Sequence, residues 1–90
     1  METFNIQNTL TNILIDLGIP PKSIKENANF SFDLGFDSLS MTELIMSIEQ
    51  TFDIEISDED YDQITTFGTA ITYIATKINF SKVGEKDIKN

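Results

Sequence analysis

The sequence predicts an all-α domain, a four-helix bundle of three main helices and one short helix, with a long loop after the first. Three observations predict this fold class. Apolar residues recur with the helical period of about 3.6 residues in three separate segments. Capping and turn residues stand at the borders of these segments. Residues 53–56 alternate like a strand, but they are few and lack a pairing partner, so we expect a loop there.

Composition limits the classes of partner. The 90 residues suffice for one domain, and the absence of cysteine leaves helix packing to stabilise it. Six lysines face fifteen acids, and the net charge of -9 opposes binding to nucleic acid or anionic membranes. It favours partners with basic surfaces. No apolar run approaches the roughly 18 residues of a membrane span, and no secretory signal is visible. We therefore expect a cytoplasmic monomer.

The first helix is expected at about residues 3–17. Its buried face comprises Ile6, Leu10, Ile13, Leu14 and Leu17. Gly18 and the pair Pro20-Pro21 end it. The following connection, residues 19–37, is too rich in apolar groups for a free linker. We expect it to lie across the helices, held by Ile24, Ala28, Phe30, Phe32, Leu34 and Phe36.

The second helix is expected to start at Ser38, with Asp37 as its N-cap, and to end near Phe52. Its buried stripe comprises Met41, Leu44, Ile45, Ile48 and Phe52. Leu39 and Met46 point away from that stripe at 100° per residue, flanked by Glu43 and Glu49. Scattered exposed apolar residues are common, but an apolar patch rimmed by charge is typical of a recognition face.

Two further helices complete the bundle. Ser57 is expected to cap a short one at residues 58–63, with Tyr61 and Ile64 turned inward. Thr65 or Thr66 is expected to cap the last, at about residues 67–79. Its buried stripe comprises Phe67, Ala70, Ile71, Ile74, Ala75 and Ile78. The domain would thus span residues 1–79, and residues 80–90 would form a flexible C-terminal tail.

Ser38 is the candidate for chemistry, because its hydroxyl stands at a helix start beside an aspartate. The chain has no histidine to take the proton of a nucleophilic serine, so a modification site is a better interpretation than a catalyst. A helix N-terminus also suits a phosphodiester anion. The competing interpretation is that Asp37 and Ser38 simply begin a helix.

Acids dominate the middle of the chain, with nine and no lysine in residues 37–62. A solvated surface explains part of this, and we favour docking for some of them. Asp58, Asp60 and Asp62 match the start of a calcium loop. Gln63 and Thr69 stand where its glycine and its bidentate glutamate are needed, so no metal site is predicted.

The chain from residue 30 to residue 78 resembles the acyl carrier proteins of fatty-acid and polyketide synthesis. The match centres on Asp33-Leu34-Gly35-Phe36-Asp37-Ser38-Leu39 and continues through residues 43–49, 52–59 and 64–66. The resemblance implies the four-helix acyl-carrier bundle. It also implies that a phosphopantetheinyl transferase attaches 4'-phosphopantetheine from coenzyme A to Ser38. The terminal thiol of this arm would carry acyl groups as thioesters.

The resemblance also assigns roles to other residues. Asp37 would belong to the motif that the transferase recognises and would help to place magnesium during modification. Leu39, Glu43, Met46 and Glu49 would contact acyl-loading and synthase enzymes with basic docking surfaces. The residues implied to line a pocket for the acyl chain are Ile45, Phe52, Ile56, Ile64 and Ala70.

Several alternatives remain open from sequence. Ser40, Thr42, Gln50 and Thr51 depart from the typical fatty-acid carrier, which keeps open a carrier dedicated to one pathway. An aminoacyl or peptidyl carrier is another alternative, although the context of Ser38 fits the acyl type better. A helical adaptor that only docks is a third. An enzyme is the least favoured, because nothing in the chain provides a base near neutral pH.

Overall fold

The computed structural model describes the backbone of residues 2–89 and the side chains of residues 6–78. Three long helices are present, α1 (Glu2–Asp16), α2 (Ser38–Phe52) and α3 (Phe67–Lys89). Two short 3-10 helices, η1 (Pro21–Ser23) and η2 (Asp58–Gln63), lie in the connections. The described chain contains no strand, only an isolated bridge between Asn29 and Thr66. The all-α class is confirmed, as are the three main helices and the short helix at residues 58–63, whereas η1 lies in the connection that was expected to be a loop.

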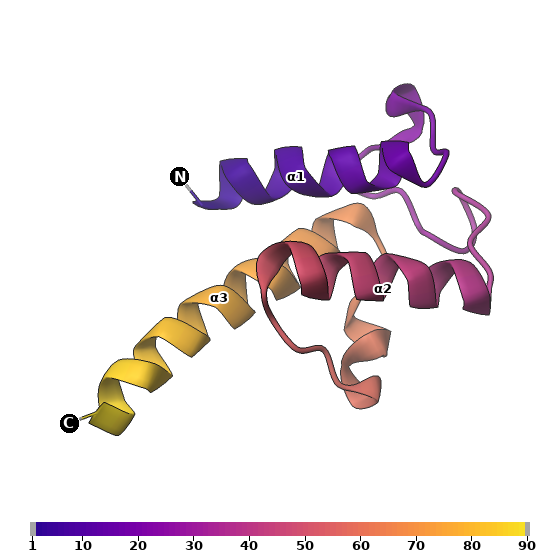
Figure 1. The fold of residues 1–90 in the computed structure, drawn as a ribbon. Coiled ribbons are helices and arrows are strands. Elements are labelled where there is room, and N and C mark those ends of the chain that lie inside the picture. The colour runs from indigo at the N-terminus through magenta and orange to yellow at the C-terminus, as the bar shows by residue number, and fades with distance from the viewer. Residues whose placement is uncertain (1, 90) are drawn as a thin grey trace.

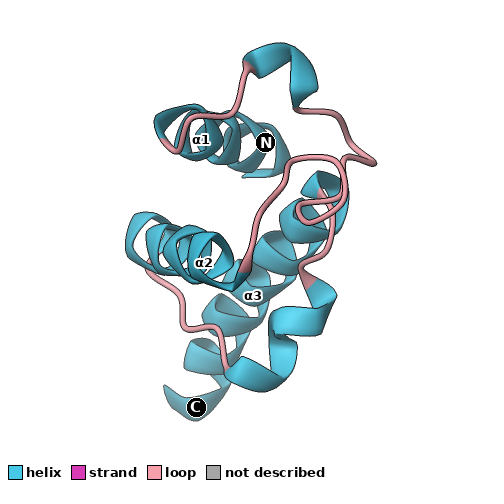
Figure 2. Ribbon diagram, turned by 90° about the vertical axis from the view of Figure 1, so that its right-hand side faces the viewer, coloured by secondary structure: helices cyan, strands magenta, loops and turns pink. Residues whose placement is uncertain are grey.

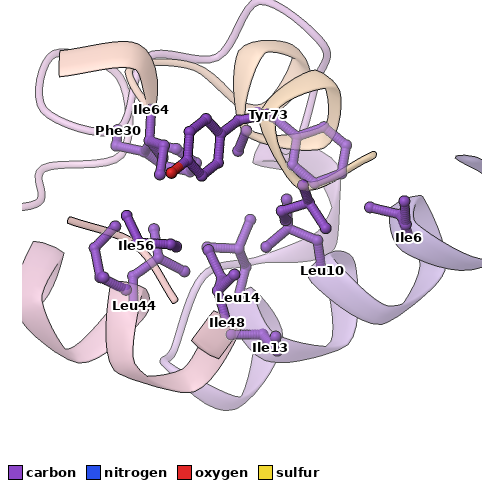
Figure 3. Packing of buried hydrophobic residues seen from close by; sticks show 14 of the residues in the cluster. Ile6, Leu10, Ile13, Leu14, Phe30, Leu44, Ile48, Ile56, Ile64 and Tyr73 are labelled. Carbon is purple, nitrogen blue, oxygen red and sulfur yellow. The ribbon is translucent and has the colours of Figure 1, made fainter. Parts of the chain in front are cut away.

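The long helices enclose one core. α1 and α2 lie side by side and run in opposite directions, and α3 crosses them and projects beyond the bundle (Figures 1 and 2). Apolar side chains of all three helices and of the loops between them point toward one another (Figure 3). The largest side chains that are fully buried are Ile6, Leu10, Leu14, Phe30, Leu44, Ile45, Ile48, Ile64 and Ile74. The helical periods of the sequence therefore identified the inner faces correctly.

The long connection between α1 and α2 packs on the core, as expected, through Phe30 and Phe36. The centroids of their rings are 5.6 Å apart, and Phe30 is 1% exposed. The expectation that Phe32 also holds the loop is wrong, because its side chain is 89% exposed. The turn at residues 29–34 reverses the chain between Phe30 and Phe36. Phe32 lies on this turn, and its side chain is exposed to solvent.

Gly68 allows this connection to reach α3. Its backbone N–H donates to the carbonyl oxygen of Glu26 at 2.8 Å, and the N–H of Phe67 donates to that of Ala28 at 3.1 Å. A Cβ at position 68 would lie 2.9 Å from the Glu26 carbonyl oxygen, closer than real Cβ atoms come to a neighbour. The low helix propensity of glycine is therefore accepted here for close approach.

The ends of the last two helices differ partly from expectation. Thr66 caps α3, because its hydroxyl accepts from the N–H of Thr69 while the hydroxyl of Thr69 accepts from the N–H of Thr66. Ser57 precedes η2 but makes no capping hydrogen bond with its side chain. The expected end of α3 near residue 79 is wrong, because the helix continues to Lys89. No proline interrupts this segment.

The division into a domain at residues 1–79 and a tail at residues 80–90 stays a prediction. Of these two ranges, Met1 and Asn90 lie outside the described residues.

Candidate functional site

Ser38 is the first residue of α2, and its side chain is exposed. Asp37 precedes it in an extended conformation, with φ -100° and ψ -171°. The Oδ1 atom of Asp37 accepts a hydrogen bond from the N–H of Ser40 at 2.9 Å, which is the expected N-cap. The sequence thus placed both residues correctly, and the hydroxyl of Ser38 stands at an accessible helix N-terminus.

The electrostatics of this end favour negative charge. Hydrogen bonds from the backbone N–H of Ser40 and then from its side chain hold the pKa of the Asp37 carboxyl below its ordinary value of 3.8. Asp37 is therefore an anion at neutral pH. The dipole of α2 and the free backbone N–H groups of its first turn would likewise stabilise a phosphodiester on the hydroxyl of Ser38.

The solvent side of α2 carries the residues expected to dock. Leu39 is 69% exposed and Met46 is 51% exposed, and Glu43 is exposed between them. We call Ser38, Leu39, Glu43 and Met46 the outer face of α2. A row of apolar groups beside a carboxylate, next to an accessible hydroxyl, has the composition of a protein interface.

Glu49 differs from the outer face, because it has a structural partner. Its side chain is half-buried, and Oε2 accepts a hydrogen bond from the N–H of Ile56 at 2.8 Å. The carbonyl oxygen of Glu49 also accepts from the N–H of Ile54 at 3.2 Å. Glu49 therefore ties the loop after α2 to the helix. The sequence showed the charge of this residue but not its partner.

The five residues expected to line an acyl pocket lie on the inner side of the bundle. They come from α2, α3 and the two loops around η2, and they belong to or pack against one hydrophobic cluster. Ile45, Ile56, Ile64 and Ala70 are buried, and Phe52 is half-buried. The structure thus brings them together behind the outer face. Their role toward an acyl chain stays a prediction.

Tyr73 is a residue that sequence reasoning missed in this part of the bundle. Its hydroxyl donates to Oδ2 of Asp60 at 2.6 Å, which joins α3 to η2. Burial, followed by the bond to Asp60 and its charge, raises the pKa of the Tyr73 phenol. The phenol therefore stays protonated and holds η2 in place at neutral pH.

The sequence around this site is similar to those of known proteins. The family model described as a phosphopantetheine attachment site matches residues 8–74, a range that contains Ser38 and the whole of α2. The acyl carrier protein of Chlamydia felis is 42% identical over 74 residues, covering 81% of this chain and 95% of that protein. The acyl carrier protein of Chlamydia muridarum is 41% identical over 76 residues, covering 83% and 99%.

The chain belongs to the acyl carrier protein family. Proteins of this family are carriers and not catalysts, which agrees with a chain that has neither histidine nor cysteine. The family model also implies a phosphopantetheine prosthetic group. In the described part of the chain, no helix is long and apolar enough to cross a membrane.

Proposed function

We propose that this protein carries acyl intermediates as thioesters on a 4'-phosphopantetheine arm attached to Ser38, for fatty-acid synthesis or a related lipid or polyketide pathway. The observation that carries the proposal is the exposed hydroxyl at the start of α2, directly after the Asp37 cap. It lies inside the segment that matches the attachment-site family. The exposed hydroxyl supports Ser38 as the site of the arm, and the family supports the identity of the arm.

The residues present fit such a group. An exposed hydroxyl gives the arm a path into solvent, and the N-terminus of α2 favours the phosphodiester charge. The group, when bound, supplies a thiol for the acyl cargo. The chain itself cannot supply one, because it has no cysteine. The side chains of Ser38 and Asp37 would anchor the arm and present the site to the transferase.

Attachment requires an enzyme from outside the chain. The hydroxyl oxygen of Ser38 forms a bond to the β-phosphorus of coenzyme A. The bond from that phosphorus to the oxygen leading to the adenosine part breaks, and the nucleotide leaves. The proton of the hydroxyl must pass to a base, and the chain has no histidine for this task. The lowered pKa of Asp37 makes the neighbouring carboxylate a weak base as well, so we assign the base to the phosphopantetheinyl transferase.

The outer face of α2 would dock the enzymes that load and use the arm. Leu39 and Met46 offer apolar contacts, and Glu43 offers charge to a basic surface. Glu49 adds charge at the other end of the row, although its loop contact restrains it. The acyl chain would enter the inner cluster beside Ile45 and the other four expected lining residues. Docking and cargo would then lie on opposite sides of one helix.

Intact-mass measurement tests the attachment site. The purified protein, incubated with coenzyme A, magnesium and a phosphopantetheinyl transferase, is expected to gain the mass of one arm. Ser38→Ala is expected to fold normally and to gain nothing, because Ser38 is exposed. Ser40→Ala and Ser47→Ala serve as matched controls on the same helix and should be modified like the wild type. An arm found on Ser40 or Ser47, or on no residue, would contradict the proposal.

A further inference from the structure

The turn before α2 presents an aromatic ring to solvent. Phe32 is 89% exposed, which is more than Leu39 or Met46. It is also more than Ile15, which is 39% exposed. Burial of such an apolar ring would stabilise the fold, and the fold does not use this contribution. Exposed aromatic rings of this kind are enriched at the centres of protein interfaces.

The backbone around Phe32 is held in one shape. Oδ1 of Asn29 accepts hydrogen bonds from the N–H groups of Ser31 and Phe32, each at 2.9 Å. Oδ2 of Asp33 accepts from the N–H of Asn29 at 2.7 Å, and the N–H of Asp33 donates back to the Asn29 carbonyl at 2.8 Å. A turn fixed by four hydrogen bonds loses little conformational entropy when its tip is bound.

The turn is also close to the hydroxyl of Ser38. The N–H of Phe36 donates to the carbonyl oxygen of Phe30 at 2.8 Å, so the chain folds back before it enters α2. Figure 1 shows this loop leading into the right-hand end of α2. Phe32 precedes Ser38 by six positions, which limits the distance between their Cα atoms to about 20 Å even in a fully extended chain.

These observations favour one class of partner. The transferase must bring its reacting groups to the hydroxyl itself, whereas later enzymes act at the far end of a long arm. A standard interface covers about 800 Å² on each partner, a patch roughly 30 Å across. A patch of that size is wide enough to include both Ser38 and the turn. The carboxylates of Asp33 and Asp37 beside it call for basic groups on the partner.

We propose that Phe32 is a docking residue for the phosphopantetheinyl transferase, inserting its ring into an apolar pocket rimmed by basic side chains. The proposal rests on the proposed function, because it assumes that Ser38 receives the arm. It adds a contact on the loop before α2, separate from the outer face of that helix. The transferase would thus contact the rigid turn and the start of α2 at the same time.

Rates of arm transfer test this assignment. The full-length wild type, Phe32→Ser, Phe32→Tyr and the exposed-residue control Ile15→Ser are compared as substrates of the organism's own transferase with coenzyme A. We expect kcat/KM to fall about tenfold or more for Phe32→Ser, mainly through KM. Phe32→Tyr keeps the ring and should stay near the wild type, as should Ile15→Ser. Unfolding in urea should be unchanged for Phe32→Ser, since the ring touches little in the fold.

The outcomes separate this inference from the proposed function. A wild type that never gains an arm overturns both. A wild type and Phe32→Ser modified with equal kcat/KM overturn the inference alone. A slower step only with an acyl-loading enzyme would assign Phe32 to a later partner and overturn the inference. A change from dimer to monomer in sedimentation of Phe32→Ser would show that a second copy covers the ring, with the same consequence.

Discussion

The two sides of α2 use the same residue types for different purposes. Leu44 on the inner side is 0% exposed and packs in the core, whereas Leu39 on the outer side is 69% exposed. Both are leucines in one regular helix, so their difference comes from where the helix is packed. The inner side stabilises the fold, and the outer side is free to meet partners. Changes on one side should therefore leave the property of the other side intact.

The loop before α2 repeats this contrast over a shorter distance. Phe30 is 1% exposed and Phe32 is 89% exposed, although one residue separates them. The N–H of Phe30 is held by the carbonyl oxygen of Thr65, while the ring of Phe32 stands on the turn. The same residue type thus serves the core at one position and a surface at the other. Packing, and not residue type, decides the role.

Alanine substitutions of the two leucines give the largest expected difference. Leu44→Ala should lower the free energy of unfolding by about 2–5 kcal/mol, because it leaves a cavity in the core. Leu39→Ala should change it by less than about 0.5 kcal/mol, because it removes an exposed group. Urea unfolding followed by circular dichroism measures both. A similar loss for the two variants would show that the outer face is part of the stabilising core.

Glu49 sharpens the comparison, because its carboxylate holds the loop after α2 while its charge is proposed to assist docking. Glu49→Ala removes the acceptor of the part-buried Ile56 N–H and should cost about 1–3 kcal/mol of stability. The matched control Glu43→Ala, on the exposed side of the same helix, should cost almost nothing. Urea unfolding followed by circular dichroism measures the stability of both variants. If the two variants lose equal stability, the Glu49 contact does not hold the loop.

Acidification gives the smallest expected effect. The Asp37 pKa is lowered on folding, so the contribution of its carboxylate is present above the ordinary value of 3.8 and is lost as pH falls through the folded-state pKa. Asparagine also caps helices well, so Asp37→Asn should be only slightly less stable near neutral pH. That difference should shrink as pH falls below about 3.8 and through the lower pKa of the folded state. NMR titration of the Asp37 carboxyl should give a midpoint below 3.8, and a midpoint above it would contradict the cap.

Local sequence predicted much of the fold and of the site. The period of apolar residues identified the inner faces, and Asp37 and Thr66 marked helix starts through caps that operate within one turn. The bounds of α2, the exposure of Leu39 and Met46 and the accessibility of Ser38 followed from the same rules. The pattern Asn29 to Asp33 could have predicted the turn as well, since both residue types bond to nearby backbone.

The rest depended on contacts between distant segments. The hydrogen bond from Ile56 to Glu49, the bond from Tyr73 to Asp60 and the approach of Glu26 to Gly68 join parts of the chain that sequence spacing does not relate. By itself the sequence determined where α2 and α3 begin and which hydroxyl stands at a helix start, because helix caps depend on neighbours within a turn. Only the tertiary structure decided that Phe30 is buried and Phe32 exposed, because burial depends on which surfaces the packed helices leave uncovered.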